Sequence, residues 1–351
     1  MLTQKEILEF RNYLKKAENP LFFFDDDPDG LCSYLILKNY IDKGKGAILK
    51  TTPSLDVNML YKVEEYCPDM VFILDIPLVT QEFIDKINVP IIWLDHHVPL
   101  KRKGVKYFNP KLNKPDSKVP TTYMAYKIAE EKDLFLGTLG SIADWHYPEY
   151  AKDFSKKYPK ILPKTIKNPP EAIFDSKLGE LITIFNLTLK RPTSKVHKIS
   201  NLLQKITDPN ELLDQTTPRS KFINREIKAL KNEYESLMDI INKQKPTKEK
   251  LFIVKVPKLK NSYTSIVSNY LIYKFPDKVI LVERESEENM IMSLRSTKIN
   301  IRVALEKTIN AVGGFGGGHD NACGAGISKR IYEDFIKTFK ENLKWKKYFL
   351  F

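Results

Sequence analysis

The sequence predicts an α/β protein: an N-terminal doubly wound, mainly parallel sheet, a helical connector, and a smaller C-terminal α/β domain. Two observations predict the first sheet. Short apolar runs alternate with helical patterns through residues 1–146, and three of these runs lead directly into an acidic residue. Continuous apolar runs are typical of parallel strands that are buried on both faces.

The predicted strands of the first domain are residues 20–24, 71–74 and 89–94. The helices expected between and after them are residues 31–40, 58–66, 80–87, 121–131 and 135–143. Doubly wound sheets bind ligands outside the carboxyl ends of their strands. The acidic residues at these ends are therefore expected to converge on one crevice.

Residues 147–250 change character, with clustered prolines followed by a helical pattern at 220–243. They hold 21 Lys and Arg against 13 Asp and Glu, which indicates a basic helical connector. The alternative is the solvated face of a structural linker. A second α/β pattern fills residues 251–351, with strands expected at 251–256, 278–283 and 290–295 and helices at 262–273, 302–309 and 332–343.

The chain has 351 residues, a net charge of +13 and a pI of about 9.3. This balance favours a polyanionic partner, first of all nucleic acid, although a lysine-rich composition without a specific partner would look the same. No apolar run is long enough to span a bilayer and no signal peptide is visible, so a cytoplasmic protein without membrane contact is expected. The three cysteines form no CxxC pair, which excludes a thiolate zinc site of that type.

The first acidic segment places Asp25, Asp27 and Asp29 at alternate positions. If the chain is extended there, the three carboxylates share one side, and Asp26 points the other way. Oxygen ligands of this kind suit hard cations such as Mg²⁺ and Mn²⁺. An acidic surface turn would explain the same residues.

Two further strand ends add chemistry to this cluster. Asp75 follows four apolar residues, so its carboxylate needs a metal or a basic partner, and it could bridge two ions. His96 and His97 follow another apolar strand. Adjacent histidines on an extended chain face opposite ways, which predicts one metal ligand and one phosphate contact or proton donor.

A glycine-rich segment lies far downstream, with five of the 14 glycines in residues 313–319. Backbone amides of such a loop can approach a phosphate closely, and His319 would add a donor. A flexible turn explains the glycines equally well. Arg295, at the end of a predicted strand, could clamp a phosphate with two hydrogen bonds.

Taken together, these segments resemble the DHH phosphoesterase superfamily in its DHH–DHHA1 branch. The resemblance rests on six motifs in the expected order, at residues 25–33, 74–75, 95–97, 140–144, 293–296 and 316–322. It implies a phosphodiesterase with two Mn²⁺ or Mg²⁺ ions. The ligand set that it implies is Asp25 and Asp27 for one ion, Asp29, His96 and Asp144 for the other, and Asp75 as the bridge.

The resemblance also implies the remaining roles. His97 would contact the scissile phosphate or assist the leaving group, so Asp75 and His97 are the predicted catalytic residues. A substrate phosphate would be held by Arg295, Gly316, Gly317, Gly318 and His319. Two departures from the family are notable. Phe23 stands where oligonucleotide-degrading relatives carry a histidine. About 25 residues follow the glycine motif, so the OB-fold found there in bacterial RecJ is not expected.

These features point to an archaeal-type RecJ-like exonuclease for single-stranded DNA or RNA, in repair or replication. A repair helicase or replication factor is an expected protein partner, and a homodimer is one option for the assembly. Two alternatives stay open: a nanoRNase or cyclic-dinucleotide phosphodiesterase for very short substrates, and a non-catalytic scaffold of a replication complex. The aromatic, basic residues 343–351 would either dock a partner or pack on their own domain.

Overall fold

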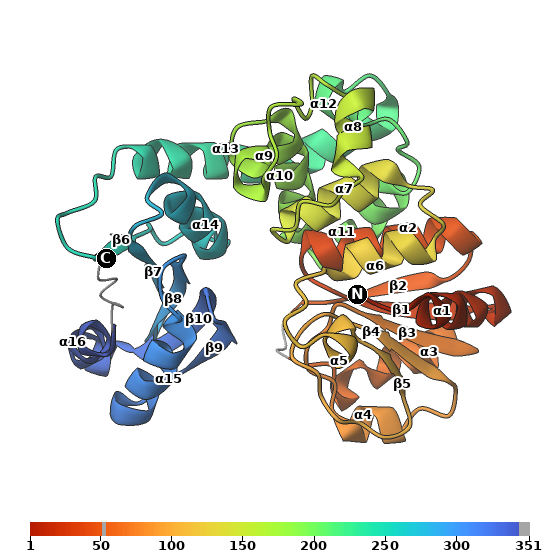
Figure 1. Cartoon of the computed structure of the whole chain (residues 1–351), viewed down its shortest axis with the longest axis horizontal. Helices are drawn as coiled ribbons and strands as arrows, with labels where there is room; N and C mark the ends of the chain where they lie inside the picture. The colour runs from red at the N-terminus through yellow and green to blue at the C-terminus, as the bar shows by residue number, and fades with distance from the viewer. Residues whose placement is uncertain (51–53, 344–351) are drawn as a thin grey trace, which may run out of the picture. The chain divides into compact units, whose positions relative to one another are not determined.

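A computed structural model describes residues 1–50 and 54–343 of the chain. The chain divides into two compact units, Met1–Lys228 and Ala229–Phe351 (Figure 1). The division falls inside the long helix α13 (Pro218–Asn242), so the predicted connector 147–250 contributes to both units. The functional domain boundaries at 146 and 250 stay predictions. Of the C-terminal aromatic segment, residues 344–351 lie outside the described part.

The first unit contains the predicted parallel sheet, with five strands in the order β2-β1-β3-β4-β5. The strands are β1 (Pro20–Asp25), β2 (Lys45–Leu49), β3 (Met70–Leu74), β4 (Ile91–Leu94) and β5 (Lys106–Phe108). The chain moves from β1 outward to β2 and then returns to β3 on the other side of β1. The carboxyl ends of β1 and β3 thus flank the point where the strand order reverses, which is where such sheets bind ligands.

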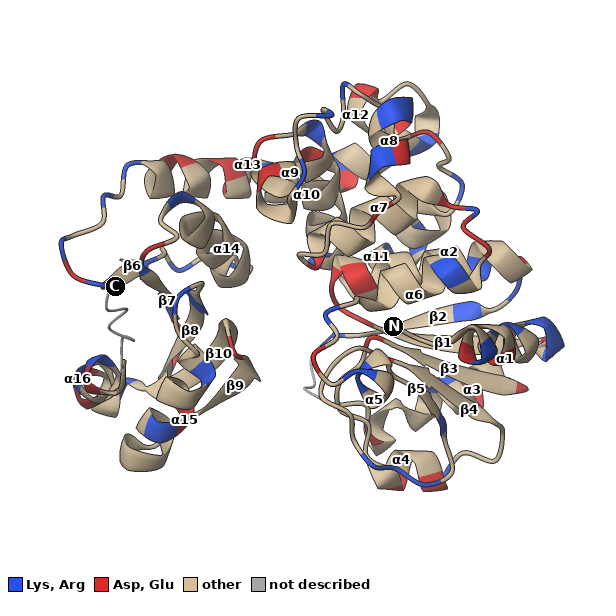
Figure 2. Ribbon diagram, in the orientation of Figure 1, with Lys and Arg blue, Asp and Glu red and all other residues tan. Residues whose placement is uncertain are grey.

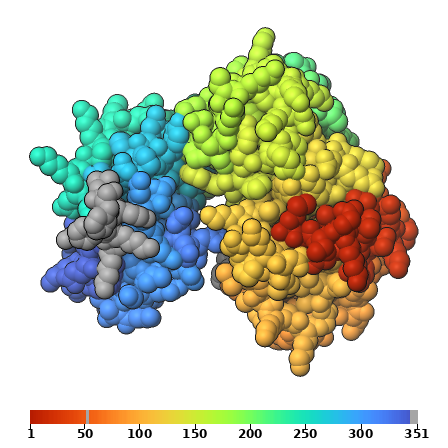
Figure 3. All heavy atoms as spheres, in the orientation of Figure 1, coloured from red at the N-terminus to blue at the C-terminus, as the bar shows by residue number. Residues whose placement is uncertain are grey.

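Alternate side chains of the central strands pack against helices on the two faces of this sheet. Leu21 and Phe23 belong to the core under α3 (Leu60–Tyr66) and α4 (Gln81–Asp85). Phe22 and Phe24 contact the ring of Tyr34 of α2 from the opposite face. The helices of that second layer are α1 (Gln4–Lys16), α2 (Pro28–Ile41) and α6 (Thr121–Ile128), and α7 (Leu134–Ala143) packs on α2 and α6. Helix α1 lies at the surface of the unit (Figure 3).

The rest of the first unit is helical: η1 (Val57–Met59), α5 (Pro110–Asn113), α8 (Ala151–Lys157), α9 (Pro169–Phe174), α10 (Lys177–Leu189), α11 (Thr193–Leu203), α12 (Pro209–Asp214) and the start of α13. Acidic and basic residues are mixed along these helices (Figure 2). Arg191 and Lys195 both pair with Glu226, and Arg219 pairs with Glu211. Part of the positive charge that favours a nucleic-acid partner is therefore neutralised by ion pairs within the unit.

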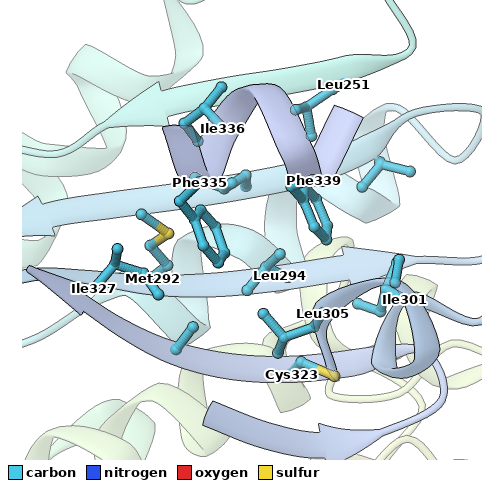
Figure 4. Packing of buried hydrophobic residues seen from close by; sticks show 14 of the residues in the cluster. Leu251, Met292, Leu294, Ile301, Leu305, Cys323, Ile327, Phe335, Ile336 and Phe339 are labelled. Carbon is cyan, nitrogen blue, oxygen red and sulfur yellow. The ribbon is translucent and has the colours of Figure 1, made fainter. Parts of the chain in front are cut away.

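The second unit is a mixed sheet with strand order β6-β7-β8-β10-β9, in which β6 and β7 are parallel and the other pairs antiparallel. Its elements are β6 (Leu251–Lys255), α14 (Thr264–Lys274), β7 (Val279–Glu285), β8 (Asn289–Ser296), α15 (Ile301–Val312), β9 (Phe315–His319), β10 (Ala322–Ser328), η2 (Lys329–Ile331) and α16 (Tyr332–Asn342). One face of this sheet packs on α15 and α16 around Phe335 and Phe339 (Figure 4).

The glycine segment differs from the loop that the sequence predicts. Residues 315–319 form the edge strand β9, paired with β10. A Cβ at Gly316 would lie 2.5 Å from the carbonyl oxygen of Gly324, and one at Gly318 would lie 2.4 Å from that of Ala322. These two glycines are therefore required by strand packing rather than by phosphate binding alone.

No helix in residues 1–50 and 54–343 is long and apolar enough to cross a membrane. This observation concerns spanning helices alone. The expected absence of any membrane contact therefore stays a prediction.

Candidate metal centre

Three overlapping groups of acidic and histidine side chains lie at the carboxyl ends of the first sheet. In each group the potential ligand atoms lie within 4.8 Å of one another. The groups are Asp25, Asp27 and Asp75; Asp29, His96 and Asp144; and Asp75, His96 and His97. All six predicted metal ligands are thus brought together. The first group contains the predicted ligands of one ion and the predicted bridge, and the second group contains the predicted ligands of the other ion. Which residue binds which ion stays a proposal.

Helix α2 begins directly after β1 and sets the positions of the first three carboxylates. Asp27 is its N-cap and accepts a hydrogen bond of 2.8 Å from the Gly30 amide. Asp29 already lies in the first turn of the helix. The chain is therefore not extended through all three residues, so the condition for a shared side is not met, and the helical turn brings Asp29 into a different ligand group from Asp25. Asp26 lies 3.8 Å from Lys50, outside the three groups.

Gly30 makes this close turn between β1 and α2 sterically feasible. A Cβ on Gly30 would lie 2.7 Å from the backbone nitrogen of Asp25 and 2.8 Å from its carbonyl oxygen. Backbone atoms cannot yield as a flexible side chain can. Any larger residue would push the start of α2, and with it Asp27 and Asp29, away from Asp25.

We expect Gly30→Ala to lower the free energy of unfolding by about 2 kcal/mol and to weaken Mn²⁺ binding, because the overpacked turn displaces the ligands. Urea unfolding and Mn²⁺ titration of the purified variant measure the two effects. Gly324→Ala is the matched control, since its new Cβ would meet nothing closer than 3.9 Å. Equal stability and equal Mn²⁺ affinity in wild type and Gly30→Ala would contradict this role.

The amino end of α6 holds two of the buried carboxylates. The backbone amides of Thr121 and Thr122 donate to Asp29 at 2.9 and 2.6 Å, and the Thr121 hydroxyl donates to Asp75 at 2.9 Å. Helix amino ends favour negative charge. The sequence analysis did not identify either threonine. A helix start is indicated after Pro120, but the sequence does not show which residues this helix end contacts.

Helix α7 approaches α2 and α6 closely enough to add Asp144, its C-terminal cap residue. A Cβ at Gly140 would lie 2.4 Å from the Thr122 hydroxyl and 2.7 Å from Cβ of Cys32. Only glycine allows this helix contact. It places a carboxylate oxygen of Asp144 at 3.8 Å from Nε2 of His96.

The two histidines lie on the same side of the site, which corrects the expectation of opposite orientations. The chain after β4 leaves the extended conformation, and the two imidazole rings lie 4.4 Å apart. Nε2 of His96 lies 3.4 Å from Asp75 and 3.9 Å from Asp29. A nitrogen of His97 belongs to the same group as Asp75 and His96.

Asp95, the fully buried first residue of the Asp-His-His triplet, orients His97 instead of joining the ligand groups. Its carboxylate lies 2.7 Å from Nδ1 of His97 and accepts hydrogen bonds from the hydroxyl of Tyr107 at 2.9 Å and the side-chain amide of Asn109 at 3.3 Å. Such carboxylate contacts fix the tautomer and orientation of an imidazole. Burial opposes charge on His97, but the hydrogen bond and charge of Asp95 outweigh it and raise the pKa of His97.

Crowding of buried carboxylates raises their pKa values. Burial, followed by the charge of Asp27, raises the pKa of Asp25 and of Asp29 to about 7. Burial and the neighbouring carboxylates, first of all Asp29, place the pKa of Asp75 and of Asp144 well above the usual range. So many carboxylates in one pocket repel one another unless cations lie between them.

The donor set fits divalent metal ions. Oδ2 of Asp75 is buried and has no hydrogen-bond partner among the described residues, although Oδ1 accepts from Thr121. An unpartnered buried carboxylate oxygen is costly unless a cation binds it. Five carboxylates and an imidazole are ligands typical of Mn²⁺ or Mg²⁺.

The second unit holds Arg295 and His319, two of the predicted phosphate-binding residues, on one sheet face. In the strand register Arg295 of β8 is paired with Ala322 of β10, which is paired with His319 of β9. Directly paired residues point to the same face, so Arg295 and His319 start from Cα atoms roughly 10 Å apart on that face. The guanidinium donates to Asn269 at 2.6 Å and to Ser265 and Ser293 at 3.0 Å.

In the described part of the chain, no carboxylate pairs with the positive charge of Arg295. Among the described residues, no Asp or Glu forms an ion pair with it, and burial lowers the pKa of Arg295 to about 10. The group therefore remains charged at neutral pH. A cation held by neutral partners is suited to binding an anion such as phosphate.

Known proteins share this fold. A family model described as the DHHA1 domain matches residues 248–344. RecJ from Thermus thermophilus, solved with Mn²⁺, is similar over 97% of this chain and 55% of RecJ, with a TM-score of 0.70 and 15% identity. The chain thus spans about half the length of that RecJ. No curated protein sequence matches it.

Two other solved structures are similar over most of their own length. A DHH-domain structure, described as a member of a family of ribosomal proteins, matches 97% of this chain and 90% of its own, with a TM-score of 0.68 and 16% identity. A pGpG-specific phosphodiesterase from Vibrio cholerae matches 92% and 98%, with a TM-score of 0.50 and 12% identity.

The chain therefore has a two-domain α/β fold that is similar to that of RecJ. Residues 248–344 match the DHHA1 domain model, and the whole chain shares its fold with RecJ and with the DHH-domain structure. The resemblance inferred from the six motifs is confirmed at this level. An archaeal subtype stays a prediction.

Proposed function

We propose that this protein is a metal-dependent phosphodiesterase that acts as an exonuclease on single-stranded DNA or RNA. The observation that carries the proposal is the group of five carboxylates and His96 around the unpartnered buried oxygen of Asp75. The similarity to RecJ solved with Mn²⁺ supports the same chemistry. Repair or replication is the proposed setting, and a helicase or replication factor the proposed protein partner.

The chain's own residues have definite tasks in this proposal. Asp25 and Asp27 would hold one Mn²⁺ or Mg²⁺, Asp29, His96 and Asp144 a second, and Asp75 both. Such ions activate water and neutralise charge on a phosphate ester. Asp95 holds His97 so that its ring faces the ligand cluster, where the imidazole would contact the scissile phosphate or give a proton to the leaving oxygen.

The DHHA1 domain would hold a substrate phosphate through Arg295, His319 and the backbone of Gly316, Gly317 and Gly318. Gly317 is informative because a Cβ there would meet nothing within 4 Å, in contrast to its two glycine neighbours. Strand packing does not require glycine at that position. A substrate that approaches the backbone closely would require it.

A phosphodiesterase for very short substrates is the second candidate. The pGpG-specific enzyme is similar over 98% of its length, whereas RecJ is similar over 55% of its own. Both candidates would use the same metal ligands. A scaffold without catalysis is less consistent with a complete set of six clustered ligands.

The test uses end-labelled single strands of DNA and RNA, from a dinucleotide to a long oligonucleotide, incubated with Mn²⁺. The nuclease proposal predicts stepwise shortening of the long strands, and gel bands give the direction. Equal rates on the dinucleotide and the long strand would favour the short-substrate enzyme. No hydrolysis of any length with Mn²⁺ or Mg²⁺ would favour the scaffold.

Arg295→Ala should raise the KM for a long single strand about tenfold or more and change kcat less, because a charge-assisted phosphate contact is lost. Steady-state kinetics measure both values. Arg302→Ala is the matched control: this arginine belongs to the same domain but pairs with Asp320. If both variants behave alike, Arg295 does not bind substrate.

A further inference from the structure

One face of the DHHA1 sheet is covered by a helix along only part of its width. Helix α14 packs on β7 and β8 on this face, where Ser268 bonds Ser293 and where Asn269 and Ser265 bond Arg295. The opposite face holds the core with α15 and α16. Beyond α14, the strands β10 and β9 present small residues on the same face as Arg295, namely Gly317, Ala322, Gly324 and Gly326.

Phe315 lies at one end of this open face. Its side chain is 62% exposed, the largest exposed fraction of any aromatic residue among the exposed large apolar side chains of the described chain. A Cβ on Gly326 would lie 2.2 Å from the ring, so Phe315 lies directly over that glycine on the β10 side. The ring is thus held against the sheet and exposed to solvent at the same time.

The positions beside Phe315 leave room for a flat group. Phe315, Gly317 and His319 alternate along β9 and therefore share one face. A Cβ at Gly317 would meet nothing within 4 Å, and one at Gly324, its partner on β10, nothing closer than 3.9 Å. This face therefore presents the ring of Phe315 and Gly317 on β9, Gly324 on β10, and the guanidinium of Arg295 on β8.

We propose that Phe315 stacks on a nucleobase of a single strand whose phosphate binds Arg295. The proposal rests on the proposed function and adds the part of the substrate that Phe315 recognises. Charge complementarity selects the occupant, because a strand of nucleic acid supplies both the anion for Arg295 and a flat apolar group for the ring. Stacking of this kind tolerates any base, which suits an enzyme that removes successive nucleotides.

The test is a binding measurement that does not need catalysis. Fluorescence anisotropy in EDTA compares a labelled oligothymidylate with an abasic strand that carries the same number of phosphates. We expect wild type to prefer the strand with bases about tenfold, Phe315→Ala to lose this preference, and Phe315→Trp to keep it. Gly317→Val should also lose it, because the side chain fills the space beside the ring.

Tyr61→Ala is the control, since Tyr61 is 53% exposed on α3 in the other unit and should leave the preference unchanged. Thermal unfolding verifies that each variant is folded. The proposal is overturned if wild type does not discriminate between the two strands, or if Phe315→Ala discriminates as wild type does. A failure of the proposed function gives a different result: wild type still prefers the strand with bases, but no strand is cut with Mn²⁺.

Discussion

Replacing Asp75 by Asn should reduce hydrolysis by at least about a thousandfold while making the metal-free protein more heat-stable. The loss follows because Asp75 belongs to two of the three ligand groups, and each is weakened by a neutral amide. The gain follows because Asp75 is buried among like charges, chiefly Asp29. Asn keeps the size of the side chain and can still accept a hydrogen bond from Thr121.

The measurements are steady-state hydrolysis with Mn²⁺ and thermal unfolding in EDTA, where we expect Tm to rise by about 2–5 °C. Added Mn²⁺ should raise the Tm of wild type but hardly that of the variant. Asp26→Asn is the matched control, because Asp26 lies next to the cluster but outside the ligand groups. Near-normal turnover of Asp75→Asn would refute the bridging role, and a lower Tm in EDTA would refute the repulsion argument.

The second large effect is a dependence of stability on pH that bound metal opposes. The pKa values of Asp25 and Asp29 are raised to about 7, above the value of about 4 for an unfolded chain. Protons bound by these carboxylates stabilise the folded state fully below about pH 4. That stabilisation is lost as the pH rises through about 7, since the folded protein must then hold the charges together.

In EDTA, wild type should therefore lose stability between about pH 4 and pH 7 as far as this cluster is concerned. Divalent ions bind the deprotonated carboxylates, so the rise in Tm caused by Mn²⁺ should increase over the same pH range. Thermal unfolding across this range, with and without Mn²⁺, measures both trends. The Asp75→Asn variant should show a smaller dependence in EDTA. A Mn²⁺ effect that is independent of pH would contradict titration of the ligands.

Local patterns in the sequence predicted β1, β3 and β4 of the first sheet and β6, β7 and β8 of the second, but missed β2, β5, β9 and β10. The same patterns supplied the candidate ligands at the strand ends, which stay predictions. A buried parallel strand is a short apolar run, and its carboxyl end is the next residue along the chain, as at Asp75. The order of motifs then indicated the superfamily whose fold the structure resembles. The local rule failed where the chain turned: alternation implied a common side for Asp25 and Asp29, but α2 begins between them.

Other parts of the site depend on contacts between segments that are distant in sequence, and such contacts cannot be predicted from single residues. Thr121 and Thr122 bind Asp29 across more than 90 positions of sequence. Gly140 belonged to the motif at 140–144, but the sequence alone does not show that its missing side chain lets α7 bring Asp144 into the cluster. The glycines of residues 315–319 were predicted to form a loop, since composition cannot show that a neighbouring strand pairs with them.

One titration tests the central claim most directly. Mn²⁺ is added stepwise to metal-free wild-type protein, and bound Mn²⁺ and hydrolysis of an end-labelled single strand are followed together. The account predicts that activity appears with Mn²⁺ binding and saturates at two ions per chain, and that Asp75→Asn shows neither. Full hydrolysis in EDTA, or saturation with Mn²⁺ without cleavage of a long strand or a dinucleotide, would contradict it.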